Sequence, residues 1–122
     1  MSRVIHFEIP AENPDRAVAF YKKVFGWKIE KYGGPANYWL VTTGEDKEPG
    51  INGAITEKSE MVPATTNTIR VQSFDDAVKE INQAGGKILM PKTAVPGIGY
   101  MTYCMDTEGN TFGIMKMDPK AR

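Results

Sequence analysis

The sequence has little that would cross-link a fold or bind a metal ion. Its 122 residues contain one cysteine, Cys104, and one histidine, His6. A single cysteine cannot form an intramolecular disulfide, which excludes a disulfide-stabilised scaffold and fits a reducing compartment. We interpret Cys104 as a small apolar side chain of the core.

The chain also lacks an excess of charge and any long apolar run. Fifteen basic residues balance fifteen acidic ones, so neither nucleic acid nor anionic lipid is an expected partner. No apolar stretch approaches the ~18 residues of a membrane span, and the N-terminal sequence "MSRVIHFEIP" has no signal-peptide core. We therefore expect a cytoplasmic protein with no nucleic acid partner and no membrane partner.

Two segments have the apolar spacing of amphipathic helices, "PDRAVAFYKKVFG" and "FDDAVKEINQAGG". The first follows Asn13 and the second follows Ser73, and both residue types cap helix N-termini well. A proline opens the first segment and the second has aspartates in its first turn, as helix starts favour. Glycine residues predict where the two helices end, the first at Gly26 and the second at Gly85 or Gly86.

The two helices belong to an internal repeat. Asp15 and Asp75 occupy matching places, 60 positions apart. Each helix follows a short strand-like segment and precedes further strand-like segments that turn residues separate. The sequence thus predicts one α+β domain over residues 1–122, with module one at about 3–58 and module two at about 65–118. The short connections predict largely antiparallel strand pairing.

Alternation along the first strand assigns its two faces. Ile5, Phe7 and Ile9 are predicted to pack beneath the helix of module one. His6 and Glu8 are then left on the other face. That face is partly polar, as a ligand-binding surface would be.

The same alternation applies to module two. Apolar residues such as Ile69 and Ile114 are predicted to face its helix. Two sheets, each covered by a helix on one side, predict a half-polar concave surface on their other faces. The residues predicted for that surface are Thr68, Arg70, Gln72, Gly113, Met115 and Met117.

Several motifs resemble one family: "NPDRAVAFYKKVFGW", "PGINGAI", "FDDAVKEINQAGGKI" and "PGIGYMTYCMDTEGNTFGIM". Together they resemble the vicinal oxygen chelate superfamily, the glyoxalase, bleomycin resistance protein and extradiol dioxygenase fold. The nearest branch is that of predicted enzymes related to lactoylglutathione lyase. The resemblance covers residues 3 to 117. It implies two βαβββ modules that form a sheet-lined cup with helices outside, and we expect a homodimer.

The resemblance also implies where the metalloenzymes of the family bind their ion. Residue by residue, those positions are His6, Gly53, Thr68 and Gly113 in this sequence. Gly53 and Gly113 have no donor atom in a side chain, and threonine is a poor ligand. A symmetric homodimer does not repair the set, because each of two sites receives one histidine. We predict no cofactor and no obligatory metal.

The predicted function is binding of a small organic molecule in the cup, with His6 and Glu8 as candidates for catalysis. Glu8 and Arg70 occupy matching places in the repeat and either pair with each other, or Arg70 binds an anionic group of the ligand. The residues predicted to contact the ligand are His6, Glu8, Trp39, Thr68, Arg70, Gln72, Tyr103 and Met115.

Two alternatives remain open. One is a metal-dependent lyase, isomerase or dioxygenase that uses His6 with carboxylates, among them Glu8, Glu57 and Glu108. The other is a structural or interaction module whose own side chains fill the cup.

Overall fold

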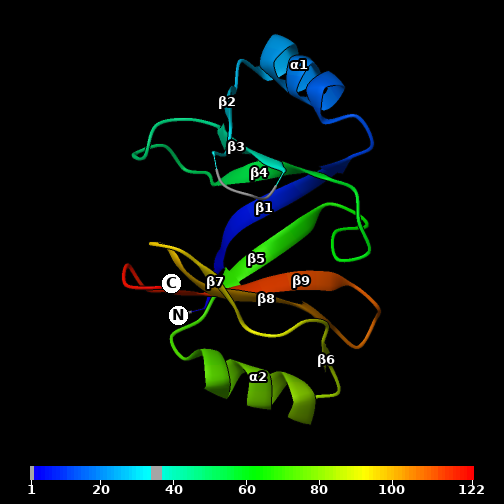
Figure 1. The fold of residues 1–122 in the computed structure, drawn as a ribbon, viewed down its shortest axis with the longest axis vertical. Coiled ribbons are helices and arrows are strands. Elements are labelled where there is room, and N and C mark those ends of the chain that lie inside the picture. The colour runs from blue at the N-terminus through cyan, green and yellow to red at the C-terminus, as the bar shows by residue number, and fades with distance from the viewer. Residues whose placement is uncertain (1, 34–36) are drawn as a thin grey trace. The chain divides into compact units, whose positions relative to one another are not determined.

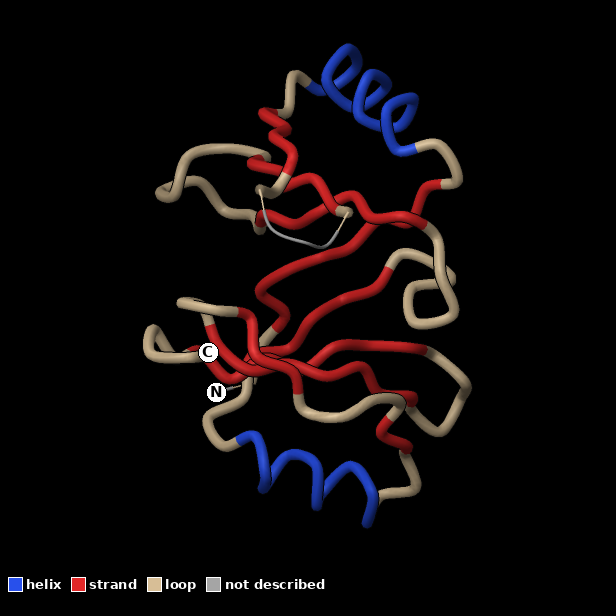
Figure 2. The backbone as a smooth tube through the Cα atoms, in the orientation of Figure 1, coloured by secondary structure: helices blue, strands red, loops and turns tan. Residues whose placement is uncertain are grey.

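The computed structural model describes residues 2–33 and 37–122. The chain divides into two compact units, one of which is His6–Thr66. The other combines Met1–Ile5 with Asn67–Arg122. Each unit contains one helix and several strands (Figures 1 and 2). Helices and strands are mixed within each unit, so the α+β class predicted from the sequence is confirmed.

The first unit contains a four-stranded sheet and helix α1. Its strands are ordered β2-β3-β4-β1. Neighbours β2 and β3, and β3 and β4, are antiparallel, whereas β1 and β4 are parallel. The elements are β1 (Val4–Ala11), α1 (Pro14–Phe25), β2 (Lys28–Lys31), β3 (Tyr38–Thr42) and β4 (Asn52–Glu57).

The second unit repeats this order around helix α2. Its strands are ordered β5-β9-β8-β6, and β7 pairs with β8. The strand-like segment 86–95 is divided into two short strands on either side of Pro91, which has no N–H for a ladder. The elements are β5 (Thr66–Arg70), α2 (Phe74–Gln83), β6 (Lys87–Ile88), β7 (Thr93–Val95), β8 (Gly99–Met105) and β9 (Thr111–Met117).

The prediction of largely antiparallel pairing holds for the later strands of each unit. The first strand of each repeat is the exception, because β1 pairs with β4 and β5 pairs with β9 in parallel. A helix and two further strands separate the members of each pair. A connection of that length allows the chain to return in the same direction.

Both helices begin at the predicted caps. Asn13 Oδ1 accepts a hydrogen bond from the Arg16 N–H at 3.1 Å, and Ser73 Oγ accepts one from the Asp76 N–H at 3.2 Å. Gly26 ends α1 with φ of 69°, a left-handed conformation that glycine adopts without strain. Within 2–33 and 37–122, neither helix has the length and apolarity needed to cross a membrane.

An apolar cluster fills the space between α1 and its sheet. Ile29, Val41 and Ile55 are buried, and Phe7 and Ile9 of β1 pack against them beside residues of α1. This packing confirms the face predicted for Phe7 and Ile9.

A second cluster lies between α2 and its sheet. Val71, Phe74 and Ile114 are buried there, with Phe112 packed against them. Cys104 belongs to the same cluster and has 0% exposure. Burial raises the pKa of the Cys104 thiol to about 11, so the thiol stays protonated and unreactive at neutral pH. The interpretation of Cys104 as a core side chain is confirmed.

Ile55 gives a direct test of the first cluster, because its side chain is 0% exposed. We expect Ile55→Ala to lower the free energy of unfolding by about 2–5 kcal/mol, since it leaves a cavity. Leu40→Ala, at a position that is 43% exposed, is the control and should cost far less. Urea denaturation measures both. Equal losses for the two variants would contradict this assignment of the core.

Candidate functional site

The sheet face opposite α1 carries the first group of candidate residues. Phe7 and Ile9 pack toward α1, so His6 and Glu8 lie on the other face of β1. The parallel register places Asn52 of β4 beside His6 and Ala54 beside Glu8. The structure therefore brings His6 and Glu8 together on one face, as predicted.

Burial gives both side chains unusual properties. Glu8 is only 8% exposed, although a buried carboxylate requires polar partners. Desolvation lowers the pKa of His6 below its ordinary value of 6.5, so the imidazole is neutral at pH 7. A neutral imidazole offers one hydrogen-bond donor and one acceptor.

Tyr38 and Thr56 lie on the same face as His6 and Glu8. The sequence analysis did not predict them as site residues. Tyr38 is paired with Thr56 across β3 and β4, and Thr56 with Pro10 across β4 and β1. Burial, the charge of Tyr32 and a hydrogen bond with it, and the charge of Glu8 raise the pKa of Tyr38 to about 12. Its phenol therefore remains a hydrogen-bond donor at neutral pH.

Thr56 Oγ1 is buried without a hydrogen-bond partner in the described part of the chain. Such a group has a cost of about 1–3 kcal/mol unless something satisfies it. The sequence offered only the two-residue alternation of a strand as a partial signal for Tyr38 and Thr56, and the structure fixes its phase. Trp39 and Ile55 are apolar and face the helix, so their neighbours Tyr38 and Thr56 must face away.

The face opposite α2 carries the second group. Thr68 of β5, Gly113 of β9 and Tyr103 of β8 form one row across the strands. Arg70 and Met115 form part of the next row. The second unit thus brings these predicted residues together on one face.

Thr68 and Gly113 are packed so closely that a side chain at residue 113 would make a tight contact with Thr68. Thr68 is 3% exposed, and a Cβ built on Gly113 would lie 3.0 Å from Thr68 Oγ1. Ordinary Cβ contacts are wider than this. A carboxylate at residue 113 would require Thr68 to move.

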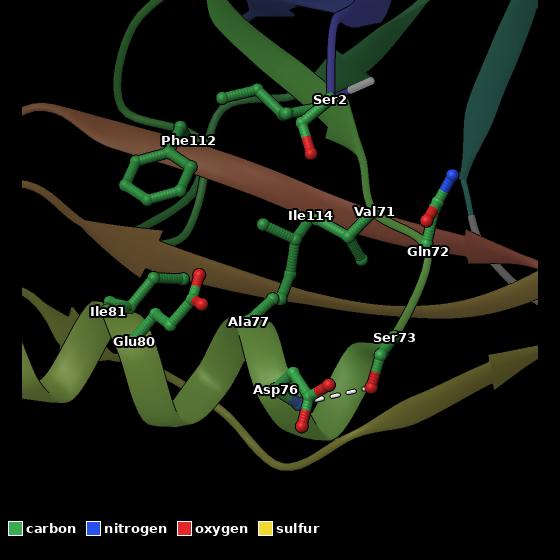
Figure 3. A pocket seen from close by; sticks show the side chains of 11 residues that line it. Ser2, Val71, Gln72, Ser73, Asp76, Ala77, Glu80, Ile81, Phe112 and Ile114 are labelled. Carbon is green, nitrogen blue, oxygen red and sulfur yellow. Dashed lines mark hydrogen bonds between the residues drawn. The ribbon is translucent and has the colours of Figure 1, made fainter.

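Three predicted residues lie elsewhere. Trp39 packs in the α1 cluster, on the face opposite to His6. Gly53 also faces α1, since a Cβ there would overlap the ring and carbonyl oxygen of Phe7. Gln72 follows the end of β5 and lines a pocket beside α2 (Figure 3).

The residues present do not fit the catalytic metal that the family implies. In the described ranges no three His, Cys, Asp or Glu side chains come together as a metal-binding group. Glu57 is exposed and accepts a hydrogen bond from Asn37 Nδ2 at 3.1 Å. It shares the helix-facing side of β4 with Ile55, away from His6. Glu108 lies in the exposed turn between β8 and β9.

Comparison with known proteins identifies the family. A family model described as the Glyoxalase/Bleomycin resistance protein/Dioxygenase superfamily matches residues 3–114. A glyoxylase-like domain-containing protein of Didymella fabae is 30% identical over 115 residues, covering 88% of each chain. The chain belongs to the glyoxalase, bleomycin resistance protein and dioxygenase superfamily, and the resemblance inferred from the motifs is confirmed.

Solved structures share the fold. A hypothetical protein from Bacillus halodurans C-125 has a TM-score of 0.74 at 14% identity, covering 99% of this chain and 98% of that chain. Methylmalonyl-CoA epimerase from Mycobacterium tuberculosis has a TM-score of 0.66 at 12% identity, covering 95% and 88%. At these identities the likeness shows the fold alone.

His6 is the one histidine of the chain, so its titration is directly observable. We expect its imidazole NMR signals to titrate below pH 6.5, because burial disfavours the charged form. The unfolded chain then binds the proton more readily, so stability is lost as pH falls below 6.5. His6→Gln should reduce that loss in urea denaturation at acid pH. A midpoint at or above 6.5 would contradict the burial of His6.

Proposed function

We propose that this protein binds a small organic molecule and does not require a metal to do so. One observation carries the proposal. The face opposite α1 gathers a neutral imidazole at His6, a buried carboxylate at Glu8 and the unpartnered hydroxyl of Thr56. These groups suit hydrogen bonding to an organic ligand, whereas a metal ion needs a further set of strong donors.

The chemistry of these side chains limits the ligand. Neutral His6 donates one hydrogen bond and accepts another, and the carboxyl group of Glu8 offers acceptor oxygens. Tyr38 donates through a phenol whose pKa is about 12. We propose that the ligand offers an N–H or O–H group to this face, as an alcohol, amide or amine does.

For the second unit, taken by itself, we also propose a face that contacts a ligand. Met115 and Tyr103 supply adaptable apolar and aromatic surface for the carbon skeleton of a ligand. Arg70 is exposed and has the geometry to bind a carboxylate or phosphate group. Thr68 completes the predicted set. A single cysteine, which cannot form an intramolecular disulfide, supports the proposal that the protein acts in the cytoplasm.

A second candidate function is proton transfer on the bound molecule. Glu8 beside a neutral histidine is the observation that favours it, because paired titratable groups serve as general acid and base. A solved methylmalonyl-CoA epimerase shares the fold. We propose such turnover only as an addition to binding, and it needs no residue beyond those already named.

A thermal-shift screen of small alcohols, amides and amines tests the binding proposal. We expect some compounds to raise the Tm, since a ligand at 100 times its Kd stabilises by about 2.7 kcal/mol. Glu8→Gln removes a charged acceptor while keeping the shape, and should weaken binding by about tenfold or more. Isothermal titration measures the change in Kd.

Glu57→Gln is the matched control, because this exposed glutamate lies on the helix-facing side of its strand. It should leave the Kd unchanged. A screen without any hit would favour the alternative of a module whose own side chains fill the cup. Equal effects of Glu8→Gln and Glu57→Gln would place the ligand elsewhere on the protein.

The metal-dependent alternative predicts the opposite behaviour with divalent ions. We expect Ni, Zn, Mn and Fe salts to give no stoichiometric gain in Tm, and a chelator to leave ligand binding intact. Elemental analysis and thermal shift measure this. A tightly held ion, one per chain and lost in His6→Ala, would overturn the metal-free proposal.

A further inference from the structure

The internal repeat produces two similar grooves, one beside each helix. A pocket of about 500 Å³ lies between α2 and its sheet in the second unit (Figure 3). A pocket of about 400 Å³ lies beside α1 in the first unit. The same repeat positions line both pockets, since Ile9 and Ala17 of one match Ile69 and Ala77 of the other, 60 positions on. The two grooves are thus copies of one architectural feature.

The chemistry of the two helices differs at these grooves. Arg16 on α1 matches Asp76 on α2, and Phe20 matches Glu80. α1 contains three basic residues and one acidic residue, whereas α2 contains three acidic residues and one basic residue. Over the whole helix the charge is therefore net positive on α1 and net negative on α2, and the groove beside α1 is lined by Glu12 as well as by Arg16.

On α1 a stripe of side chains runs along one flank, and two of its members, Arg16 and Phe20, line the groove. Arg16, Phe20 and Val24 follow one another at four-residue spacing, so they form a stripe along the helix. Phe20 and Val24 are each 54% exposed, and the Phe20 ring meets Tyr21 edge-on at 5.1 Å. Lys23 lies beside this stripe. A phenylalanine held in place on the surface is typical of a contact surface.

The groove beside α2 has the complementary character. Its floor is apolar, with Ile81, Phe112 and Ile114 around the space in Figure 3. Asp76 and Glu80 line it from α2. Ser73 fixes the first turn there, because its Oγ accepts the N–H of Asp76. The groove thus offers an apolar slot with two carboxylates along one side.

We propose that the groove beside α2 binds α1 of a second copy of this chain. Phe20 of the second copy enters the apolar slot, and Arg16 and Lys23 approach Asp76 and Glu80. Opposite charges on the two surfaces favour this pairing and disfavour α1 against α1 or α2 against α2. The inference is independent of the ligand proposal, because none of these residues belongs to the face that carries His6 and Glu8.

Symmetry defines the expected product. In a two-fold dimer each contact occurs twice, so α1 of each copy binds the α2 groove of the other. An arrangement that does not close would produce longer chains of copies through the same contact. The proposal thus assigns a contact surface to the homodimer that we expect from the sequence.

Analytical ultracentrifugation over a wide concentration range tests the proposal. The wild-type chain should change from 13.5 kDa to twice that mass as concentration rises. Phe20→Lys should raise the dissociation constant by about tenfold or more. Arg16→Glu and Glu80→Arg should each weaken association, and the double variant should recover it, since the reversed charges attract again.

Lys22→Glu is the matched control for Arg16→Glu. It makes the same change from a basic to an acidic residue, but on the opposite flank of α1. Circular dichroism and Tm establish that every variant is folded. A monomer at all concentrations would overturn the proposal, as would a dimer that Phe20→Lys and Lys22→Glu affect equally. Longer species that respond to the same variants would support the contact in its open arrangement. Saturation of the groove by a long-chain amine without any self-association would show that a small amphiphile is the occupant instead.

Discussion

The two-residue period of β1 determines which groups are available for chemistry. Phe7 and Ile9 are committed to the core beneath α1, so His6 and Glu8 have only the other face. The neighbouring strand β4 must also accommodate the Phe7 side chain. Gly53 must be glycine because any side chain there would overlap Phe7, and its close approach keeps β4 in register beside β1. That register in turn places Thr56 and Tyr38 on the face of His6 and Glu8.

A similar constraint in the second unit accounts for the missing carboxylate of the metalloenzymes. Gly113 pairs with Thr68 in the sheet, and the Thr68 side chain occupies the space that a residue at 113 would need. A donor side chain at residue 113 would therefore have to displace the Thr68 side chain slightly. A surface built from His6 and Glu8 without a second imidazole favours recognition of an organic group through hydrogen bonds.

The duplicated grooves show how one repeat can acquire two roles. Backbone and helix placement are shared, yet the residues on the helix flanks have diverged from Arg16 and Phe20 on α1 to Asp76 and Glu80 on α2. Divergence toward opposite charge is the pattern that mutual recognition between copies requires. The surface proposed for ligand binding lies opposite each helix, and the surface proposed for self-association lies beside it.

The sequence by itself determined the repeat, both helices with their caps, the α+β class and the family, because these depend on local periodicity and on residues such as Asn13, Ser73 and Gly26. It also determined the faces of β1, since alternation needs no partner strand. Only the tertiary structure decided that β1 pairs in parallel with β4 and that Gly53 and Trp39 face α1 while Tyr38 and Thr56 face the site. Those outcomes depend on the register between strands distant in sequence, where a shift of one residue exchanges the two faces.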